Sequence, residues 1–271
     1  MIKYTLQDGN SIDVPQHIKE LTLEQYLGIR HYTSRPEFAH KTDFEIQYFI
    51  LQSVIDFPLD DLTIKELNEV SKLMEGMVLG DVYNLSSKQY RWKINGIEYG
   101  AYVNFDNYDY REPFYIDQIV MSGNEADYVP KILAALIRPY TKVPSKEFPQ
   151  LDRIKLDDLM VEDIEPRSSL FLKMKIEYIY HIINDYYKWK QGHVASFSNL
   201  YSRKPKDEKG EMLQTIKIHP KWGPIAMLDR LCNGDVTKTE EVLDTNYISI
   251  LFRMCYWDVK DEYYYKINKS R

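Results

Sequence analysis

Alternating polar and apolar positions mark two short β-hairpins in this chain. The segment IKYTLQDGNSIDVP alternates on both sides of Asp8-Gly9, and YRWKINGIEYGAYVNF alternates around Asn95-Gly96. These dipeptides are strong hairpin signals, because tight turns need residues that accept a positive φ. We therefore predict hairpins near residues 1 and 90, the second with a type I′ turn.

Apolar positions at helical spacing follow the first hairpin, and each run opens with a capping box. In this motif a threonine and a glutamate or glutamine three residues later each accept a backbone N–H from the other. The pairs are Thr22 with Gln25, Thr42 with Glu45, and Thr63 with Glu66. The stretch to about residue 80 is expected to form a hairpin and three short helices.

The rest of the chain is mostly helical in pattern. A short helix is expected at PFYIDQIV, so the order hairpin then helix occurs twice, and EADYVPKILAALIRPY predicts a helix that Pro139 stops. Residues 167–190 give the clearest amphipathic helix, and the tail NYISILFRMCYWDVKDEYYYKINK predicts another. The tract QGHVASFSNLYSRKPKDEKGEMLQTIKIHPKWGP is rich in Gly, Pro, Ser and Lys, which is typical of a linker.

Together these elements predict an α+β fold that is mainly helical, with two small β-hairpins. We expect four segments along the chain. They are an N-terminal hairpin plus helices at 1–88, a second hairpin plus helices at 89–190, a polar linker at 191–221 and a C-terminal helical module at 222–271.

Composition limits the function classes. The 271 residues are 44% hydrophobic, which is enough to bury roughly three quarters of the unfolded surface. The formal net charge of −6 disfavours binding to nucleic acid and to anionic membranes, since both are bound through lysine and arginine.

The longest candidate for a membrane span is SLFLKMKIEYIYHIINDYY, which is interrupted by charges, so we expect no membrane span and a soluble protein. Two distant cysteines indicate a reducing compartment. The N-terminus lacks the continuous apolar core of a secretion signal, so we expect the mature protein to start there.

Tyrosine is the compositional outlier, at 23 residues. A surplus of tyrosine suits protein interfaces, because the ring offers a rigid contact area with a polar tip. Codon bias in an AT-rich genome explains the surplus equally well. In the interface reading, the candidate surface lies on the C-terminal helix and comprises Tyr247, Trp257, Tyr263, Tyr264 and Tyr265.

The segment GDVTKTEEVLDTNY, from Gly234 to Tyr247, resembles a cation site in its density of carboxylates. A calcium loop that starts at Asp235 would need glycine at its sixth position and glutamate at its twelfth, where the chain has Glu240 and Asn246. We interpret the segment instead as helix initiation, with a Thr237–Glu240 capping box and with Asp244 or Thr245 capping the next helix.

No other constellation predicts a catalytic, cofactor or metal site. The histidines lack metal-ligand spacing, and His181 is interpreted as packing beside a tyrosine hydroxyl. Nucleophile elbows and glycine-rich phosphate loops are missing. The acidic runs at 60–61, 106–112 and 157–165 are interpreted as solvated loops or helix starts, with a hydrolytic carboxylate pair as the alternative. The basic runs YSRKPKDEKG and KINKSR are interpreted as solvated, with single-strand nucleic-acid binding as the alternative.

Three segments together resemble a known group of proteins: LTLEQYLGIRHY, VPKILAALIRPYTKV and WGPIAMLDRLCNGDVTKTEEVLDTNYISILFRMCYWDVKDEYYY. The resemblance is to proteins from the structural-gene modules of tailed bacteriophages, especially those of gut Bacteroidetes. These are tail or head-tail structural proteins or tail-assembly chaperones. The likeness covers about half the chain and rests on apolar spacing and a GD…EV helix start.

The resemblance implies a non-enzymatic virion structural protein of the tail or head-tail region, found in the virion and, during assembly, in the host cytoplasm. Its implied partners are portal, tail or neck components, and we expect self-association in a ring, with no cofactor. A tail-assembly chaperone that is absent from the mature virion is one alternative. A phage-encoded enzyme or nucleic-acid-binding factor is another.

Overall fold

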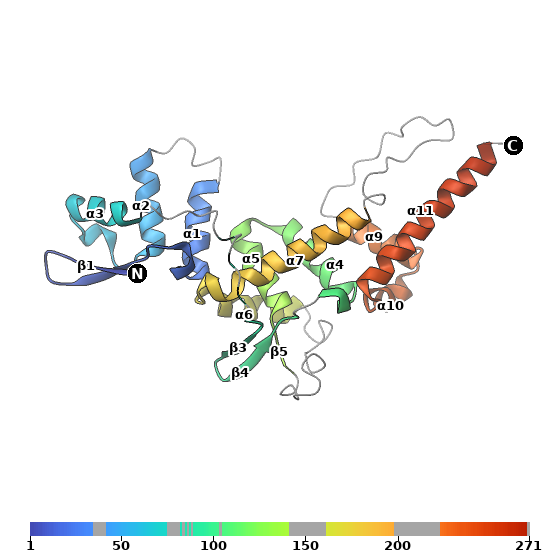
Figure 1. Ribbon diagram of the computed structural model, residues 1–271, viewed down its shortest axis with the longest axis horizontal. Coiled ribbons are helices and arrows are strands. Elements are labelled where there is room, and N and C mark those ends of the chain that lie inside the picture. Colours follow the sequence, from blue (N-terminus) through green and yellow to red (C-terminus); the bar gives the residue numbers. More distant parts are fainter. Residues whose placement is uncertain are drawn as a thin grey trace. The chain divides into compact units, whose positions relative to one another are not determined.

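The computed structural model describes residues 1–34, 42–74, 82, 85, 87, 89–102, 105–140, 161–197 and 223–269. It is mainly helical with two small antiparallel sheets, which confirms the predicted α+β class (Figure 1). The chain forms two compact units, and neither is continuous in sequence. Unit 1 contains residues 1–101 and 123–184, and unit 2 contains residues 102–122 and 185–271.

Both predicted hairpins lie in unit 1. Strands β1 (Ile2–Thr5) and β2 (Ser11–Val14) pair antiparallel, and Gly9 takes a φ of +86° in the connecting turn. Strands β3 (Arg91–Ile94) and β4 (Ile97–Gly100) are joined by Asn95 and Gly96, whose φ values of 50° and 83° fit the predicted type I′ turn. A two-residue strand that the sequence did not predict, β5 (Arg138–Pro139), pairs with β4.

All three predicted capping boxes are confirmed. They open α1 (Leu23–Ser34), α2 (Asp43–Val54) and α3 (Ile64–Met74), and in each the threonine and its acidic or amide partner exchange hydrogen bonds. Unit 1 is completed by α5 (Glu125–Leu136), α6 (Val161–Leu172) and the first half of α7 (Ile176–Ser196). Helix α1 packs on α2 and α5, and α5 packs on α6.

The single helix predicted over residues 167–190 is wrong, because α6 ends at Leu172 and α7 begins at Ile176. The break follows from tertiary pairing. Leu23 N–H donates to the Met174 carbonyl at 2.9 Å, and Ile176 N–H donates to the Leu21 carbonyl at 3.0 Å. These bonds tie the start of α1 to the start of α7, so residues 173–175 leave the helix. Helix α7 then continues to Ser196, so the first six residues of the predicted linker 191–221 are helical.

His181 has a structural role in the unit 1 core. It is buried on α7, and its Nε2 lies 2.8 Å from the Gln89 carbonyl oxygen. The Tyr90 ring packs edge to face against the imidazole, with the two ring centres 5.5 Å apart. The imidazole therefore joins α7 to the chain that leads into β3.

Unit 2 contains α4 (Arg111–Ser122), the second half of α7, α9 (Gly223–Cys232), α10 (Thr239–Leu243) and α11 (Tyr247–Lys269). Two helix starts are again tied by backbone pairing. Tyr110 N–H donates to the Thr245 carbonyl at 2.8 Å, and Tyr247 N–H donates to the Tyr108 carbonyl at 2.9 Å. The core is formed by apolar residues of these helices, among them Phe114, Leu228, Leu231, Val242, Leu243, Ile250 and Leu251.

Candidate protein-binding surface

The acidic segment Gly234–Tyr247 does start helices, but by other residues than predicted. Thr237 lies inside a 3₁₀ turn, and its N–H donates to Oδ1 of Asp235 at 3.1 Å, so the Thr237–Glu240 capping box is wrong. Asp235 closes the tighter turn because its side chain reaches an N–H two residues ahead. The predicted cap of α11 is also wrong, since Oδ1 of Asn246 accepts from Ile248 N–H at 3.1 Å.

Two carboxylates of this segment hold a buried arginine. Nη2 of Arg111, at the start of α4, donates to Oε2 of Glu240 at 2.8 Å and to Oδ1 of Asp244 at 2.7 Å. The Arg111 side chain is 6% exposed, whereas Glu240 and Asp244 are 74% and 56% exposed. Burial lowers the pKa of the guanidinium, but the hydrogen bonds to Asp244 and Glu240 outweigh it and raise the pKa overall. The ion pairs of Arg111 with Glu240 and Asp244 therefore link α4 to α10.

Tyr247 belongs to the interior of unit 2. It is 4% exposed, and its ring stacks on that of Tyr110 at an interplanar angle of 8°. The centres of the Tyr247 and Trp189 rings are 5.3 Å apart. Nε1 of Trp189 donates to Oδ1 of Asp106 at 2.8 Å. Tyr247, one of the five residues predicted as an interface, is therefore buried, against Tyr110 just before α4 and against Trp189 of α7.

Buried polar groups of α7 also serve packing in unit 2. The Tyr186 side chain is fully enclosed, and burial raises the pKa of its hydroxyl well above the usual value. Lys190, one turn further on, pairs with Asp117 of α4. The tyrosine therefore stays protonated, and the ion pair links α7 to α4.

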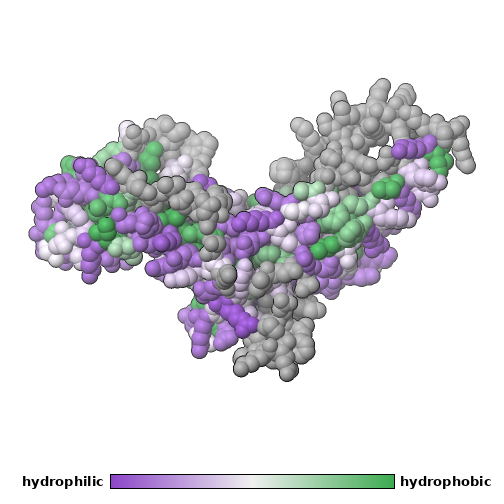
Figure 2. Space-filling view, in the orientation of Figure 1, coloured by the Kyte–Doolittle hydropathy of each residue, from purple (hydrophilic) through white to green (hydrophobic). Residues whose placement is uncertain are grey.

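The exposed face of α11 carries an apolar row, which we call the α11 stripe. Its members are Phe252, Tyr256, Val259 and Tyr263, each between 61% and 65% exposed. Their spacing of four, three and four residues keeps them on one side of the helix. Ile250 and Leu251 face the core from the other side. Figure 2 shows hydrophobic residues alternating with hydrophilic ones along this helix.

Two of the predicted interface tyrosines lie on this exposed part of α11. Tyr263 belongs to the stripe, and Tyr264 beside it is 53% exposed. Trp257 is half-buried, and the Arg253 guanidinium lies 5.1 Å from its ring centre. The side chain of Tyr265 is outside what the structure describes.

Cations line one edge of the stripe. Arg253 and Lys260 are exposed, and both follow a stripe residue by one position, which places them on the same flank. Lys260 lies 5.9 Å from the ring centre of Tyr264. The stripe is therefore an apolar and largely aromatic surface with two cations along one flank.

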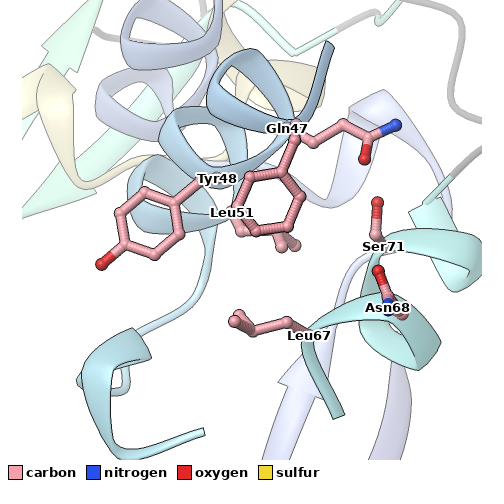
Figure 3. A pocket seen from close by; sticks show the side chains of 7 residues that line it. Gln47, Tyr48, Leu51, Leu67, Asn68 and Ser71 are labelled. Carbon is pink, nitrogen blue, oxygen red and sulfur yellow. The ribbon is translucent and has the colours of Figure 1, made fainter. Parts of the chain in front are cut away.

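A shallow groove lies between α2 and α3 in unit 1, and we call it the α2–α3 groove. Figure 3 shows its wall residues Gln47, Tyr48, Leu51, Leu67, Asn68 and Ser71. Phe44, near the start of α2, also lines it and is exposed. The groove is open to solvent and encloses only about 10 Å³, which is room for about one water molecule.

Acidic residues of the runs considered from sequence make hydrogen bonds within the protein where the structure describes them. Asp60 accepts a hydrogen bond from the Tyr48 hydroxyl at 2.7 Å, and the first part of the 157–165 run lies outside those residues, as does YSRKPKDEKG. In the parts of the chain that the structure covers, no three or more His, Cys, Asp or Glu residues are grouped to hold a metal ion. No helix in the same parts has the length and apolarity that a membrane crossing requires.

Sequence reasoning identified the C-terminal helix but missed both the stripe and the groove. The stripe has a sequence signal, since its 4-3-4 spacing repeats on the side opposite the core residues. The groove has none, because it arises only when α2 and α3 come together.

Comparison with known proteins gives no relative for this arrangement. The chain matches no protein-family model, no curated protein and no solved structure.

Proposed function

We propose that this protein is a non-enzymatic structural component of a tailed bacteriophage, which acts in the tail or head-tail region by binding other proteins. The observation that carries the proposal is the α11 stripe. A row of four exposed apolar and aromatic side chains on one helix face is costly to leave in water, and such patches mark protein interaction sites.

The composition of the stripe supports a binding role. Three of its four members are aromatic, and aromatic residues together with arginine are enriched among the residues that dominate interface energies. The resemblance of the three sequence segments to phage structural proteins supplies the biological setting. Portal, tail or neck proteins are the proposed partners, and the virion and the host cytoplasm during assembly are the proposed locations.

The test is to co-express the protein with the products of its neighbouring genes and to measure the mass of the purified species by light scattering. We expect a stoichiometric complex with at least one neighbour, or an oligomer of the chain alone. The variant Tyr256→Ser/Val259→Ser should lose that complex. The variant Val236→Ser is the matched control, because Val236 is a highly exposed apolar residue of unit 2 outside the stripe.

A wild-type protein that stays monomeric and joins none of these partners would refute the proposal. Mass spectrometry of purified virions then separates the two assembly roles. A component of the particle is retained in fixed ratio to the other structural proteins, whereas an assembly chaperone is absent.

A further inference from the structure

The starts of α7 and α11 are built in the same way. In each case three residues separate the helix from the one before it. The N–H of the first residue, Ile176 or Tyr247, donates to a carbonyl of a distant segment, and a return bond from that segment reaches the carbonyl two residues before the helix. The same positions are also buried, namely Phe171, Ile176, Ile179 and Tyr180 around the start of α7, and Val242, Tyr247, Ile250 and Leu251 around the start of α11. Counted from the first residue, each position of α7 therefore has a counterpart in α11.

One face of α7 is covered by the chain that leads into β3. Nε1 of Trp92 donates to the carbonyl of Tyr178, the third residue of the helix, at 3.2 Å. Nδ2 of Asn184, the ninth residue, donates to the Val82 carbonyl at 2.9 Å. His181, the sixth residue, lies midway between these two contacts. The covering chain therefore runs along this face of α7 in the direction opposite to the helix.

The part of the covering chain nearest β3 is extended and places two aromatic rings against α7. Trp92 lies in β3, and the carbonyl of Tyr90 accepts the Ala101 N–H at 3.0 Å, which continues the pairing of the hairpin. The ring centres of Tyr90 and Trp92 lie 5.5 Å and 6.4 Å from that of His181. Alternate side chains of an extended chain point to the same side, so residues two positions apart can both contact one helix face.

The counterpart face of α11 is exposed. Its third, sixth and ninth residues are Ser249, Phe252 and Cys255. Phe252 is 63% exposed, whereas its counterpart His181 is 1% exposed. Tyr256, four residues after Phe252 and seven after Ser249, lies on the same side and is 65% exposed. The first two members of the α11 stripe therefore occupy the face that an extended chain covers on α7.

Arg253 gives this face of α11 a charge that α7 lacks. It is exposed on the flank of the stripe, and no other charged residue occurs between residues 245 and 257. Its counterpart on α7 is Ile182, which is fully buried. A segment that covers the stripe therefore meets a cation, and a carboxylate at that point gives the complementary charge.

We propose that the α11 stripe binds an extended segment of another protein, which lies along α11 as the chain before β3 lies along α7. The segment carries two aromatic or large apolar side chains two residues apart, which cover Phe252 and Tyr256, and a carboxylate opposite Arg253. The inference rests on the proposed function, because it names the kind of segment that the stripe receives. The segment comes from another protein, since Tyr90 and Trp92 of this chain are already held on α7.

The first part of the test places a photoreactive residue on the stripe. Phe252→p-benzoylphenylalanine keeps an aromatic ring on the face, and Val236→p-benzoylphenylalanine is the matched control at an exposed position outside the stripe. Each full-length variant is checked by circular dichroism, purified with the co-expressed products of the neighbouring genes and irradiated. Mass spectrometry should identify one segment of a neighbouring product that cross-links to position 252 and not to position 236.

The second part determines the conformation and charge of the cross-linked segment. In an alanine scan, an extended segment should lose affinity by about tenfold or more at positions two residues apart, whereas a helix would lose it at positions three or four apart. Arg253→Glu should weaken the complex by about fivefold, and lysine in place of the facing carboxylate of the partner should restore it. Lys238→Glu, at an exposed lysine outside the stripe, is the control and should leave the affinity unchanged.

Three results would overturn this inference and leave the proposed structural role in place. They are losses of affinity at positions three or four apart, a cross-link from position 252 into a second copy of this chain, and a stable complex that position 252 does not cross-link. A wild type that joins no neighbouring product and stays monomeric overturns both the inference and the proposed function.

Discussion

Arg111 pairs with Glu240 and Asp244, and we expect the loss of the cation and the loss of the two carboxylates to change stability by different amounts. Replacing Arg111 by Met removes a buried cation and leaves Glu240 and Asp244, which are already more than half exposed. Those carboxylates return to water at small cost, so we expect the free energy of unfolding of unit 2 to fall by about 1–2 kcal/mol, near the worth of one hydrogen bond to a charged group.

The reverse perturbation should cost more. Glu240→Gln together with Asp244→Asn leaves the guanidinium buried, with only 6% of its side chain exposed and no compensating charge from either partner. Removing the partner of a buried charge costs about 3–5 kcal/mol. The double amide variant is therefore expected to be less stable than Arg111→Met by about 2 kcal/mol, even though its side chains are nearly unchanged in size.

Hydrogen exchange of the backbone amides of Tyr110 and Tyr247 is a local assay, since these N–H groups tie the start of α4 to the start of α11. A difference of about 2 kcal/mol corresponds to roughly a 30-fold difference in exchange rate. Lys238→Met is the matched control, because Lys238 pairs with Asp235 at 3.6 Å on the surface and should change stability by less than about 0.5 kcal/mol. Equal costs for the two Arg111 perturbations, or a larger cost for Arg111→Met, would refute the reasoning.

Three further predictions concern single positions. The hydrogen bond from Tyr4 to Glu69 raises the pKa of Tyr4 to about 12, so the stability that this bond provides should be lost as pH rises from 10 through 12. The difference between the ultraviolet titrations of the wild type and of Tyr4→Phe should show one tyrosine that ionises near pH 12. Glu69→Gln should move that ionisation to lower pH. Gly28→Ala should destabilise by about 1–3 kcal/mol, because its Cβ would lie 2.8 Å from a side chain of α2. Gly192→Ala, in open space on α7, should instead stabilise by about 0.5–1 kcal/mol in urea titration, and a loss at both glycines would contradict the packing argument. Asn246→Asp keeps the helix-capping oxygen but loses the donor to two backbone carbonyls, so thermal unfolding should show a cost of about 1–2 kcal/mol, and an unchanged midpoint would count against the donor role.

Local chemistry explains which elements were predictable. The Thr22 capping box and the Asn95-Gly96 turn depend on residues within four positions of each other, and both are confirmed. The break between α6 and α7 was missed because Ile176 bonds to Leu21, which is far away in sequence. The apolar period continues across the break, so no pattern in that segment reveals it.

The predicted interface residues of α11 differ in their exposure for a similar reason. Tyr263 and Tyr264 are exposed as expected, because α11 continues beyond the core of unit 2. Tyr247 has the same residue type but is enclosed by Tyr110 and Trp189. Only the tertiary structure distinguishes these positions, since each neighbour of Tyr247 comes from a segment distant in the sequence.

The discontinuous make-up of unit 2 has a consequence during synthesis on the ribosome. Arg111 and Glu240 are 129 residues apart, and residues 123–184 of the other unit are made between them. At about 5–20 residues per second, α4 waits roughly 6–26 s before the carboxylate that holds it emerges. Unit 1 can close first, while α4 keeps its apolar face uncovered. Premature termination before the last third of the chain should therefore give nascent products that expose Phe114 and are degraded or aggregate.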